Sequence, residues 1–321
     1  MQMNMVSALN NALDLAMQEN EDVVLLGEDV GEDGGVFRVT DGLIKKYGEN
    51  RVIDTPLAES GIIGTAIGMA LGGLHPVPEI QFAGFMYLGY SQLINHAARY
   101  RERTRSGLSV PMVVRTPVGG GIRALEHHSE SPEVLYSYGG GLIVVEPSNP
   151  YDAKGLMMKA LHLKDPVIFL EPTKLYRLFK QDVPEESYEV DIGKANIIRA
   201  GEDLTIITYG TMVPIVNDVV SQKHVDAEII DLRTINPLDE KTILDSVKKT
   251  GKAMIVHEAS LSFGVGAEIA ARISEKALYE LDAPIIRVAS LDLPYPFPAY
   301  ENYYMPNAKK VGAAIDRLLT M

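Results

Sequence analysis

The sequence contains neither cysteine nor tryptophan. A chain without cysteine cannot form disulfides, cannot bind zinc or an iron–sulfur cluster through thiolates, and has no cysteine nucleophile. Basic side chains are also scarce, since 30 Lys and Arg stand against 43 Asp and Glu and leave a net charge of −13. With no basic cluster to neutralise a run of phosphates, the chain is not expected to bind nucleic acid, whereas a basic protein partner is easier to accommodate.

The sequence also lacks a long apolar run of the kind that crosses a membrane. The uncharged stretch at residues 60–78, which no other exceeds in length, is about as long as a membrane span but contains five glycines and two prolines. The first ten residues lack the basic start and apolar run of a secretory signal, so cytoplasmic residence is the expectation. Hydrophobic residues at 46% and charged residues at 23% are typical of a soluble globular protein, and 321 residues favour two domains.

Strand and helix patterns alternate through the first half of the chain. Short apolar runs rich in β-branched residues predict buried strands, and apolar residues spaced three and four apart predict helices between them. The predicted strands are residues 23–26, 77–81, 110–115, 142–146 and 167–170, and the predicted helices are 7–17, 60–74, 88–105 and 151–162. Strands that are apolar throughout indicate a mainly parallel sheet with helices on both faces.

A second, shorter series follows a polar segment. Residues 173–193 are predicted to form a surface linker, which places the domain boundary near residue 190. After it, strands are predicted at 204–209, 227–232, 253–257 and 285–289, with helices at 214–222, 239–249, 266–278 and 308–319. The expected fold is α/β, with two doubly wound domains at residues 1–190 and 191–321.

The most informative motif is Asp54-Thr55-Pro56-Leu57-Ala58-Glu59-Ser60-Gly61, which is followed by glycines at 64, 68 and 72. Glycines four apart lie along one face of a helix and let another helix approach closely. One interpretation is a tightly packed core helix, in which Glu59 is an acid stabilised by the helix dipole. The other is that Glu59 is a functional acid, because burying a carboxyl group among apolar neighbours is costly.

Further segments extend this motif into a resemblance that covers essentially the whole chain. They are GEDV at 27–30, QFA at 81–83, EHHSESPE at 126–133, PYDAKGL at 150–156 and DLRTINPLD at 231–239. Together with the motif around Glu59, they resemble the β subunits of thiamine diphosphate-dependent 2-oxo acid dehydrogenases, of the branched-chain 2-oxo acid or pyruvate dehydrogenase type, in the transketolase-like superfamily. The resemblance implies a pyrimidine-binding domain followed by a transketolase C-terminal-like domain.

The resemblance also implies roles for particular residues. Glu59 corresponds to the glutamate that hydrogen-bonds the pyrimidine ring of thiamine diphosphate and activates the cofactor. Leu57, Gln81 and Phe85 correspond to positions lining the aminopyrimidine pocket, and Phe85 stands where many relatives have tyrosine. Glu28 corresponds to an acid near the glutamate network that runs between active sites. Ordinary core packing is the alternative for Leu57, Gln81 and Phe85.

Residues 119–132 have too little apolar content to form core and are predicted to be a mobile loop, which contains His127 and His128. A metal site is a poor explanation, because adjacent side chains in an extended loop point apart and no third ligand has suitable spacing. By the resemblance, His128 corresponds to a substrate-channel histidine that stabilises the substrate carboxylate or passes a proton during acyl transfer. His127 has no matching role, and a solvated loop histidine is the alternative for His128.

The chain lacks the signature with which such enzymes hold the diphosphate through a metal, namely Gly-Asp-Gly followed some distance later by Asn-Asn. Mg²⁺ prefers oxygen ligands from carboxylates and phosphates. The resemblance therefore implies that an α subunit holds Mg²⁺ and the diphosphate in an α2β2 heterotetramer. No metal ligand is expected in this chain.

The resemblance implies a second partner and a reaction. Asp292, in the segment LDLP at 291–294, resembles the family surface that binds the dihydrolipoyl acyltransferase core. The implied reaction is oxidative decarboxylation of a 2-oxo acid with reductive acylation of a lipoyl group on that partner. The loop at 126–133 favours a branched-chain 2-oxo acid over pyruvate. An acetoin dehydrogenase subunit, a split transketolase-type subunit and a non-catalytic scaffold are the alternatives.

Overall fold

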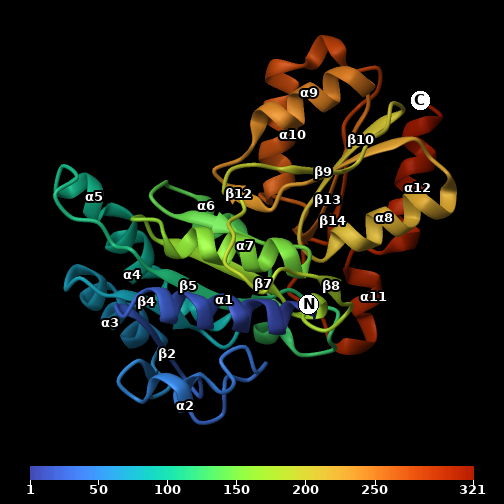
Figure 1. The fold of residues 1–321 in the computed structure, drawn as a ribbon. Helices are drawn as coiled ribbons and strands as arrows, with labels where there is room; N and C mark the ends of the chain where they lie inside the picture. Colours follow the sequence, from blue (N-terminus) through green and yellow to red (C-terminus); the bar gives the residue numbers. More distant parts are fainter.

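The computed structural model describes residues 1–321. The chain forms two large sheets, each covered by helices on both faces, and a small two-stranded sheet (Figure 1). The larger sheet has seven strands in the order β12-β6-β7-β5-β4-β2-β3, and the smaller has five in the order β14-β13-β10-β11-β9. Only the edge strands β12 and β9 pair antiparallel with their neighbours in these sheets. The predicted α/β class with two doubly wound, mainly parallel sheets is confirmed.

The larger sheet is built almost entirely from the first half of the chain. Its strands there are β2 (Val23–Gly27), β3 (Val52–Asp54), β4 (His75–Glu79), β5 (Val113–Val118), β6 (Ile143–Val145) and β7 (Val167–Pro172), and the helices are α1 (Met5–Glu19), α2 (Leu43–Tyr47), α3 (Glu59–Leu71), α4 (Tyr90–Asn95), α5 (Tyr100–Arg103), α6 (Glu133–Ser137) and α7 (Pro150–Leu161). Successive strand residues point to opposite faces. Accordingly Leu25 packs in the core cluster that contains α1 and α7, whereas Leu26 packs in the cluster that contains α3.

The smaller sheet is built from the second half. Its strands are β9 (Asn196–Arg199), β10 (Leu204–Thr208), β11 (Ala227–Asp231), β13 (Ala253–Ser260) and β14 (Ile286–Ser290), and the helices are α8 (Met212–Lys223), α9 (Glu240–Thr250), α10 (Val265–Lys276), α11 (Glu301–Tyr304) and α12 (Ala308–Leu319). Helices α8 and α12 share one core cluster, and α9 and α10 lie in the other. No helix is both long enough and apolar enough to cross a membrane.

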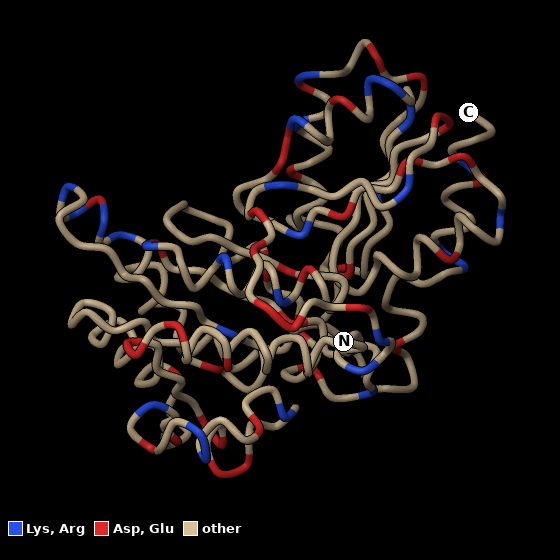
Figure 2. The backbone as a smooth tube through the Cα atoms, in the orientation of Figure 1, with Lys and Arg blue, Asp and Glu red and all other residues tan.

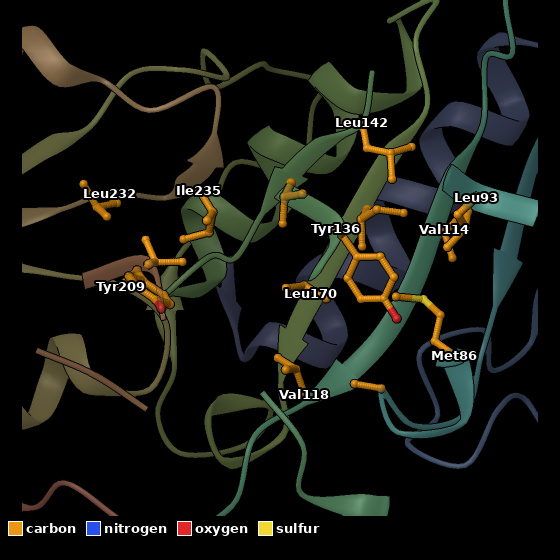
Figure 3. Packing of buried hydrophobic residues seen from close by; sticks show 14 of the residues in the cluster. Met86, Leu93, Val114, Val118, Tyr136, Leu142, Leu170, Tyr209, Leu232 and Ile235 are labelled. Atoms are coloured by element: carbon orange, nitrogen blue, oxygen red, sulfur yellow. The ribbon is translucent and has the colours of Figure 1, made fainter. Parts of the chain in front are cut away.

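The two halves share a continuous core. Strand β12 (Thr234–Asn236) comes from the second half but pairs with β6 at the edge of the larger sheet. One cluster of 33 buried hydrophobic residues joins Val118 and Leu170 of the first half to Tyr209 and Leu232 of the second (Figure 3). This packing holds the second half against the loops of the larger sheet. The boundary near residue 190 stays a prediction.

The predicted continuous helix at residues 88–105 is wrong. The chain instead forms a 3-10 turn (Phe85–Gly89), α4, a second 3-10 turn (Ala97–Arg99) and α5, with the break at His96. A Cβ on Gly141 would lie 2.1 Å from the carbonyl oxygen of Ala98, so a glycine turn packs directly against the backbone here. A tertiary contact thus overrides the apolar periodicity. The broken segment projects from the body and bears arginines at 99, 101, 103 and 105 around α5 (Figure 2).

The predicted surface linker at 173–193 is at the surface only in part. Leu175, Tyr176, Val183 and Val190 are buried, and β8 (Gln181–Asp182) pairs antiparallel with β1 (Gln2–Met3) near the N-terminus. The polar composition of the segment concealed these widely spaced apolar residues. The segment therefore belongs to the packed structure of the first half.

Candidate active site

The predicted site residues all follow the carboxyl ends of four neighbouring parallel strands. In the sheet, β2 lies between β3 and β4, and β5 follows β4. The chain therefore passes from β2 to one side and returns to the other, which makes the end of β2 a topological switch point, where ligands bind in open α/β sheets. The six residues are placed as follows: Glu28 after β2, Leu57 and Glu59 after β3, Gln81 and Phe85 after β4, and His128 after β5.

Glu59 is the first residue of α3 and is a buried acid without a partner in this chain. The residue is 7% exposed, and its carboxylate makes no hydrogen bond or ion pair within the chain, although its oxygens are not fully closed off from solvent. The preceding Ala58 provides no side-chain cap for the helix. The helix dipole favours an acid in the first turn, which explains its position. The Glu59 oxygens are not among the fully buried atoms that lack a partner, so the carboxylate keeps free acceptor sites that a ligand can reach.

The glycine face of α3 is open. A Cβ on Gly68 would meet nothing within 4 Å, and on Gly64 it would meet only the side chain of Gln92 at 4.0 Å. The opposite face, which includes Ile63 and Ile67, is buried in the core. The interpretation as a tightly packed core helix is therefore wrong for the glycine face, because apart from Gln92 no other part of this chain packs against Gly64 or Gly68. The glycine face of α3 is therefore an exposed surface beside Glu59, against which another helix can pack closely.

Acidic groups cluster at the switch point. The side-chain amide of Gln81 donates a hydrogen bond to Asp29 at 3.2 Å. Partial burial raises the pKa of Glu28, and the carboxylates of Asp29 and Glu59 raise it further. Leu57 is 70% exposed, so core packing does not account for it. Asp29 was missed by the sequence analysis, although it belongs to the GEDV segment.

His128 lies edge-on to two phenyl rings. Its ring centroid is 4.4 Å from that of Phe82 and 5.3 Å from that of Phe85, with interplanar angles of 67° and 78°. Phe82 and Phe85 are themselves 5.8 Å apart in an edge-to-face arrangement. The structure thus brings the predicted Phe85 and His128 together. It adds Phe82, which the QFA segment contained but which was given no role; His127 lies more exposed, with its ring 6.4 Å from Phe85.

A buried ionic cluster forms the floor beneath these loops. Arg115 in β5 donates to both oxygens of Glu171 at 2.7 and 3.0 Å and to Glu79, the last residue of β4, at 2.6 Å. Tyr176 donates to Glu171 at 2.6 Å. Burial raises the pKa of Glu79, while Arg115 opposes that shift. We call Arg115, Glu79, Glu171 and Tyr176 the Arg115 cluster.

A sizeable cavity lies away from this edge. It has a volume of about 920 Å³ and is lined by the projecting α4–α5 segment, the glycine turn at 139–141 and neighbouring residues, with none of the six predicted site residues. This cavity is therefore separate from the residues around Glu59. The structure contains no group of three or more His, Asp or Glu side chains placed to hold a metal ion.

Comparisons with known proteins agree with this architecture. Residues 1–178 match the family described as "Transketolase, pyrimidine binding domain", and residues 193–311 match "Transketolase, C-terminal domain". A solved structure described as "Split gene transketolase, inactive beta4 tetramer" has a TM-score of 0.75 and 22% identity and covers 99% of this chain and 98% of that one. At that identity the likeness shows a shared fold.

Two curated proteins are much more similar in sequence. Both are named pyruvate dehydrogenase E1 component subunit beta. The protein from Acholeplasma laidlawii is 52% identical over 317 residues, which are 98% of this chain and 97% of that protein. The protein from Staphylococcus epidermidis is 49% identical over 313 residues, which are 97% and 96%. The chain therefore belongs to the family of pyruvate dehydrogenase E1 component β subunits, which are thiamine diphosphate-dependent 2-oxo acid dehydrogenase components of the transketolase-like superfamily.

Proposed function

We propose that this chain is the β subunit of a cytoplasmic pyruvate dehydrogenase, which oxidatively decarboxylates pyruvate and reductively acylates a lipoyl group on an acyltransferase partner. The observation on which this rests is Glu59, a buried, unpartnered carboxyl group at the start of an open glycine-faced helix. The branched-chain substrate expected from the sequence gives way to pyruvate, because the relatives at 52% and 49% identity are pyruvate dehydrogenase subunits.

The residues at the switch point fit the pyrimidine ring of thiamine diphosphate. Glu59 supplies an acid for a ring nitrogen and holds or releases the proton there. Phe85 would supply an aromatic face and Leu57 an exposed apolar side chain, while Gln81 and Glu28 would supply polar groups. Thiamine diphosphate, when bound, supplies the carbon nucleophile and the electron sink for decarboxylation. The task of this chain is to bind and orient the ring and to manage the proton at Glu59.

An α subunit completes the site in this proposal. It holds Mg²⁺ and the diphosphate, for which the chain has no Gly-Asp-Gly signature. The uncovered glycine face of α3 offers a surface for close contact beside Glu59. We therefore propose that the catalytic unit is an α2β2 heterotetramer.

His128 is the proposed group for the substrate side of the reaction. Its half-buried ring is held between Phe82 and Phe85, on the loop that follows β5. A histidine in that position can bind the substrate carboxylate or pass a proton during transfer of the acyl group to the lipoyl thiol. Phe82 and Phe85 limit the orientations of its ring.

Co-expression with an α subunit tests the proposal. The α-containing enzyme is expected to decarboxylate pyruvate, measured with an artificial electron acceptor, faster than it decarboxylates a branched-chain 2-oxo acid. The chain expressed without α is expected to show no turnover and to bind thiamine diphosphate weakly or not at all by calorimetry, because half of the ligand contacts are missing. Turnover by the chain alone contradicts the shared site. Preference for a branched-chain acid or for acetoin contradicts the substrate assignment.

Asp292 is the proposed contact for the acyltransferase core. It is exposed and accepts hydrogen bonds from the backbone N–H of Ser262 at 2.8 Å and from its hydroxyl at 2.7 Å. These bonds fix the carboxylate beside exposed Leu293. Asp292→Arg is expected to weaken binding of the acyltransferase about tenfold, measured by calorimetry, because it reverses a charge at the contact. Ser262→Ala keeps the charge and is the control, so equal losses in both variants, or none in Asp292→Arg, would exclude this contact.

A further inference from the structure

The loop at residues 119–132, which contains His128, is fastened by the second half of the chain. The backbone N–H of Gly120, at its start, and the hydroxyl of Ser131, at its end, both donate to the same carboxylate oxygen of Glu258 in β13. The loop also closes on itself, since the N–H of Gly119 donates to the carbonyl of Glu130 at 2.9 Å. A single acid thus binds both ends of the loop.

The backbone at the start of the loop is shaped to this acid. Gly119 has φ +86, and a Cβ there would lie 2.9 Å from the bound oxygen of Glu258. Only glycine gives both the left-handed conformation and the space. Glu258 itself is 8% exposed, and the neighbouring strand residue, His257, points to the opposite face of the sheet. The hydrogen bonds of the Glu258 carboxylate therefore all go to the loop through Oε1, while Oε2 is buried without a partner.

The bond from Ser131 to Glu258 is 3.4 Å long, and the second half makes other hydrogen bonds to the loop and to Glu133, which follows it and accepts from the hydroxyl of Tyr209 at 2.5 Å. The N–H of Gly121 donates to the hydroxyl of Tyr295 at 3.4 Å, and the N–H of Arg123 donates to Glu301 at 3.2 Å. Both donors lie near the start of the loop, so neither contact reaches the end that follows His128. Glu258 alone joins the two ends by side-chain hydrogen bonds.

We propose that Glu258 is a positioning residue, which holds both ends of the loop and thereby sets the place of the His128 ring against Phe82 and Phe85. This inference rests on the proposed function, in which His128 acts on the substrate or the acyl group. Glu258 lies about 130 positions after His128 along the chain, but the shared hydrophobic core keeps β13 against the loop, so Glu258 can influence the position of His128. Glu258 acts through His128 and does not itself touch substrate.

Amide hydrogen exchange of the α-containing enzyme tests the fastening of the loop. Glu258→Leu removes the acceptor at similar size, and exchange in the peptide that contains Gly120 is expected to become about tenfold faster. Glu258→Gln keeps an accepting oxygen and is expected to exchange within about twofold of the unsubstituted enzyme. Glu228→Leu is the control, since Glu228 is also a buried acid of the second half but pairs with Lys249. Unchanged exchange in Glu258→Leu overturns the proposal.

A double-mutant cycle tests whether the effect passes through His128. Glu258→Leu and His128→Ala are each expected to lower kcat for acylation of a lipoyl domain more than they raise KM, and Glu258→Gln is expected to restore most of the loss. In the double variant, kcat is expected to fall no further than in His128→Ala alone. If the reductions in kcat of the two single variants multiply in the double variant, the positioning role is overturned while the proposed function stands. Full activity of His128→Ala overturns the role of His128 in the proposed function and the positioning role with it.

Discussion

Glu59→Gln is expected to assemble with the α subunit and to lower turnover by about 10²- to 10⁴-fold, the range found for loss of a general acid or base. The substituted side chain has the same size but cannot take up or release a proton at the cofactor ring. Because Glu59 makes no hydrogen bond within the chain, the exchange removes no internal contact. Decarboxylation measured with an artificial electron acceptor gives the rate, and thermal unfolding shows that the fold survives.

The control for this variant is Glu21→Gln, an exposed acid just before β2. It changes the net charge by the same amount and is expected to leave turnover unchanged. Thermal unfolding should place the Glu59→Gln chain near the melting temperature of the unsubstituted chain, because the substitution keeps the size of the side chain and removes no hydrogen bond within the chain. Near-normal turnover in Glu59→Gln would exclude the proposed mechanism, even though the family assignment would stand.

The fold follows from local patterns that a sequence displays directly. Apolar runs and helical spacing gave the main strands and helices, and the position of Glu59 at the start of α3 was within one residue of the prediction. Strand β3, which precedes that motif, was missed because it has three residues and ends exposed. The break at His96 was missed because the apolar spacing continues through it, and the nearby backbone contact of Ala98 with Gly141 joins residues far apart along the chain.

The site is predictable only where its residues form part of a recognisable segment. Glu59, Phe85 and His128 could be named because they stand in such segments, and the strand order then explains why they meet. Asp29 and Phe82 stood in the same segments, but their contacts with Gln81 and His128 depend on side-chain placement. Interactions between distant parts of the chain, such as that of Glu258 with the loop, leave no periodic pattern in the sequence.

Arg115→Met is expected to lower the free energy of unfolding by about 3–5 kcal/mol at pH 7, the cost of breaking a buried ion pair from one side. Arg115 is about 2% exposed and is the only cation in contact with Glu79 and Glu171. Without it, two carboxylates face each other in the core. Urea unfolding of the variant and of the unsubstituted chain gives the difference.

The pH dependence of this loss identifies its cause. The pKa of Glu79 is already raised by burial in the intact protein, and removal of Arg115 takes away the group that opposes that shift. A carboxyl group whose folded pKa lies above its unfolded value contributes stability below the unfolded pKa and loses it as pH rises through the folded pKa. The deficit of Arg115→Met should therefore shrink as pH falls towards 5, where protonation removes the unpaired charges.

Two further variants separate the ionic cluster from general packing. Adding Glu79→Gln and Glu171→Gln to Arg115→Met is expected to recover much of the loss, since neutral amides are cheaper to bury than unpaired carboxylates. Lys223→Met breaks the exposed pair with Asp316 and is expected to cost less than about 1 kcal/mol. If Arg115→Met lowered the free energy of unfolding by less than about 1 kcal/mol, or by an amount independent of pH, the Arg115 cluster would not stabilise the structure beneath the site. Glu79 ends β4 two residues before Gln81. A loss of about 3–5 kcal/mol in the free energy of unfolding should therefore also increase the mobility of the loops that contain Gln81 and Phe85.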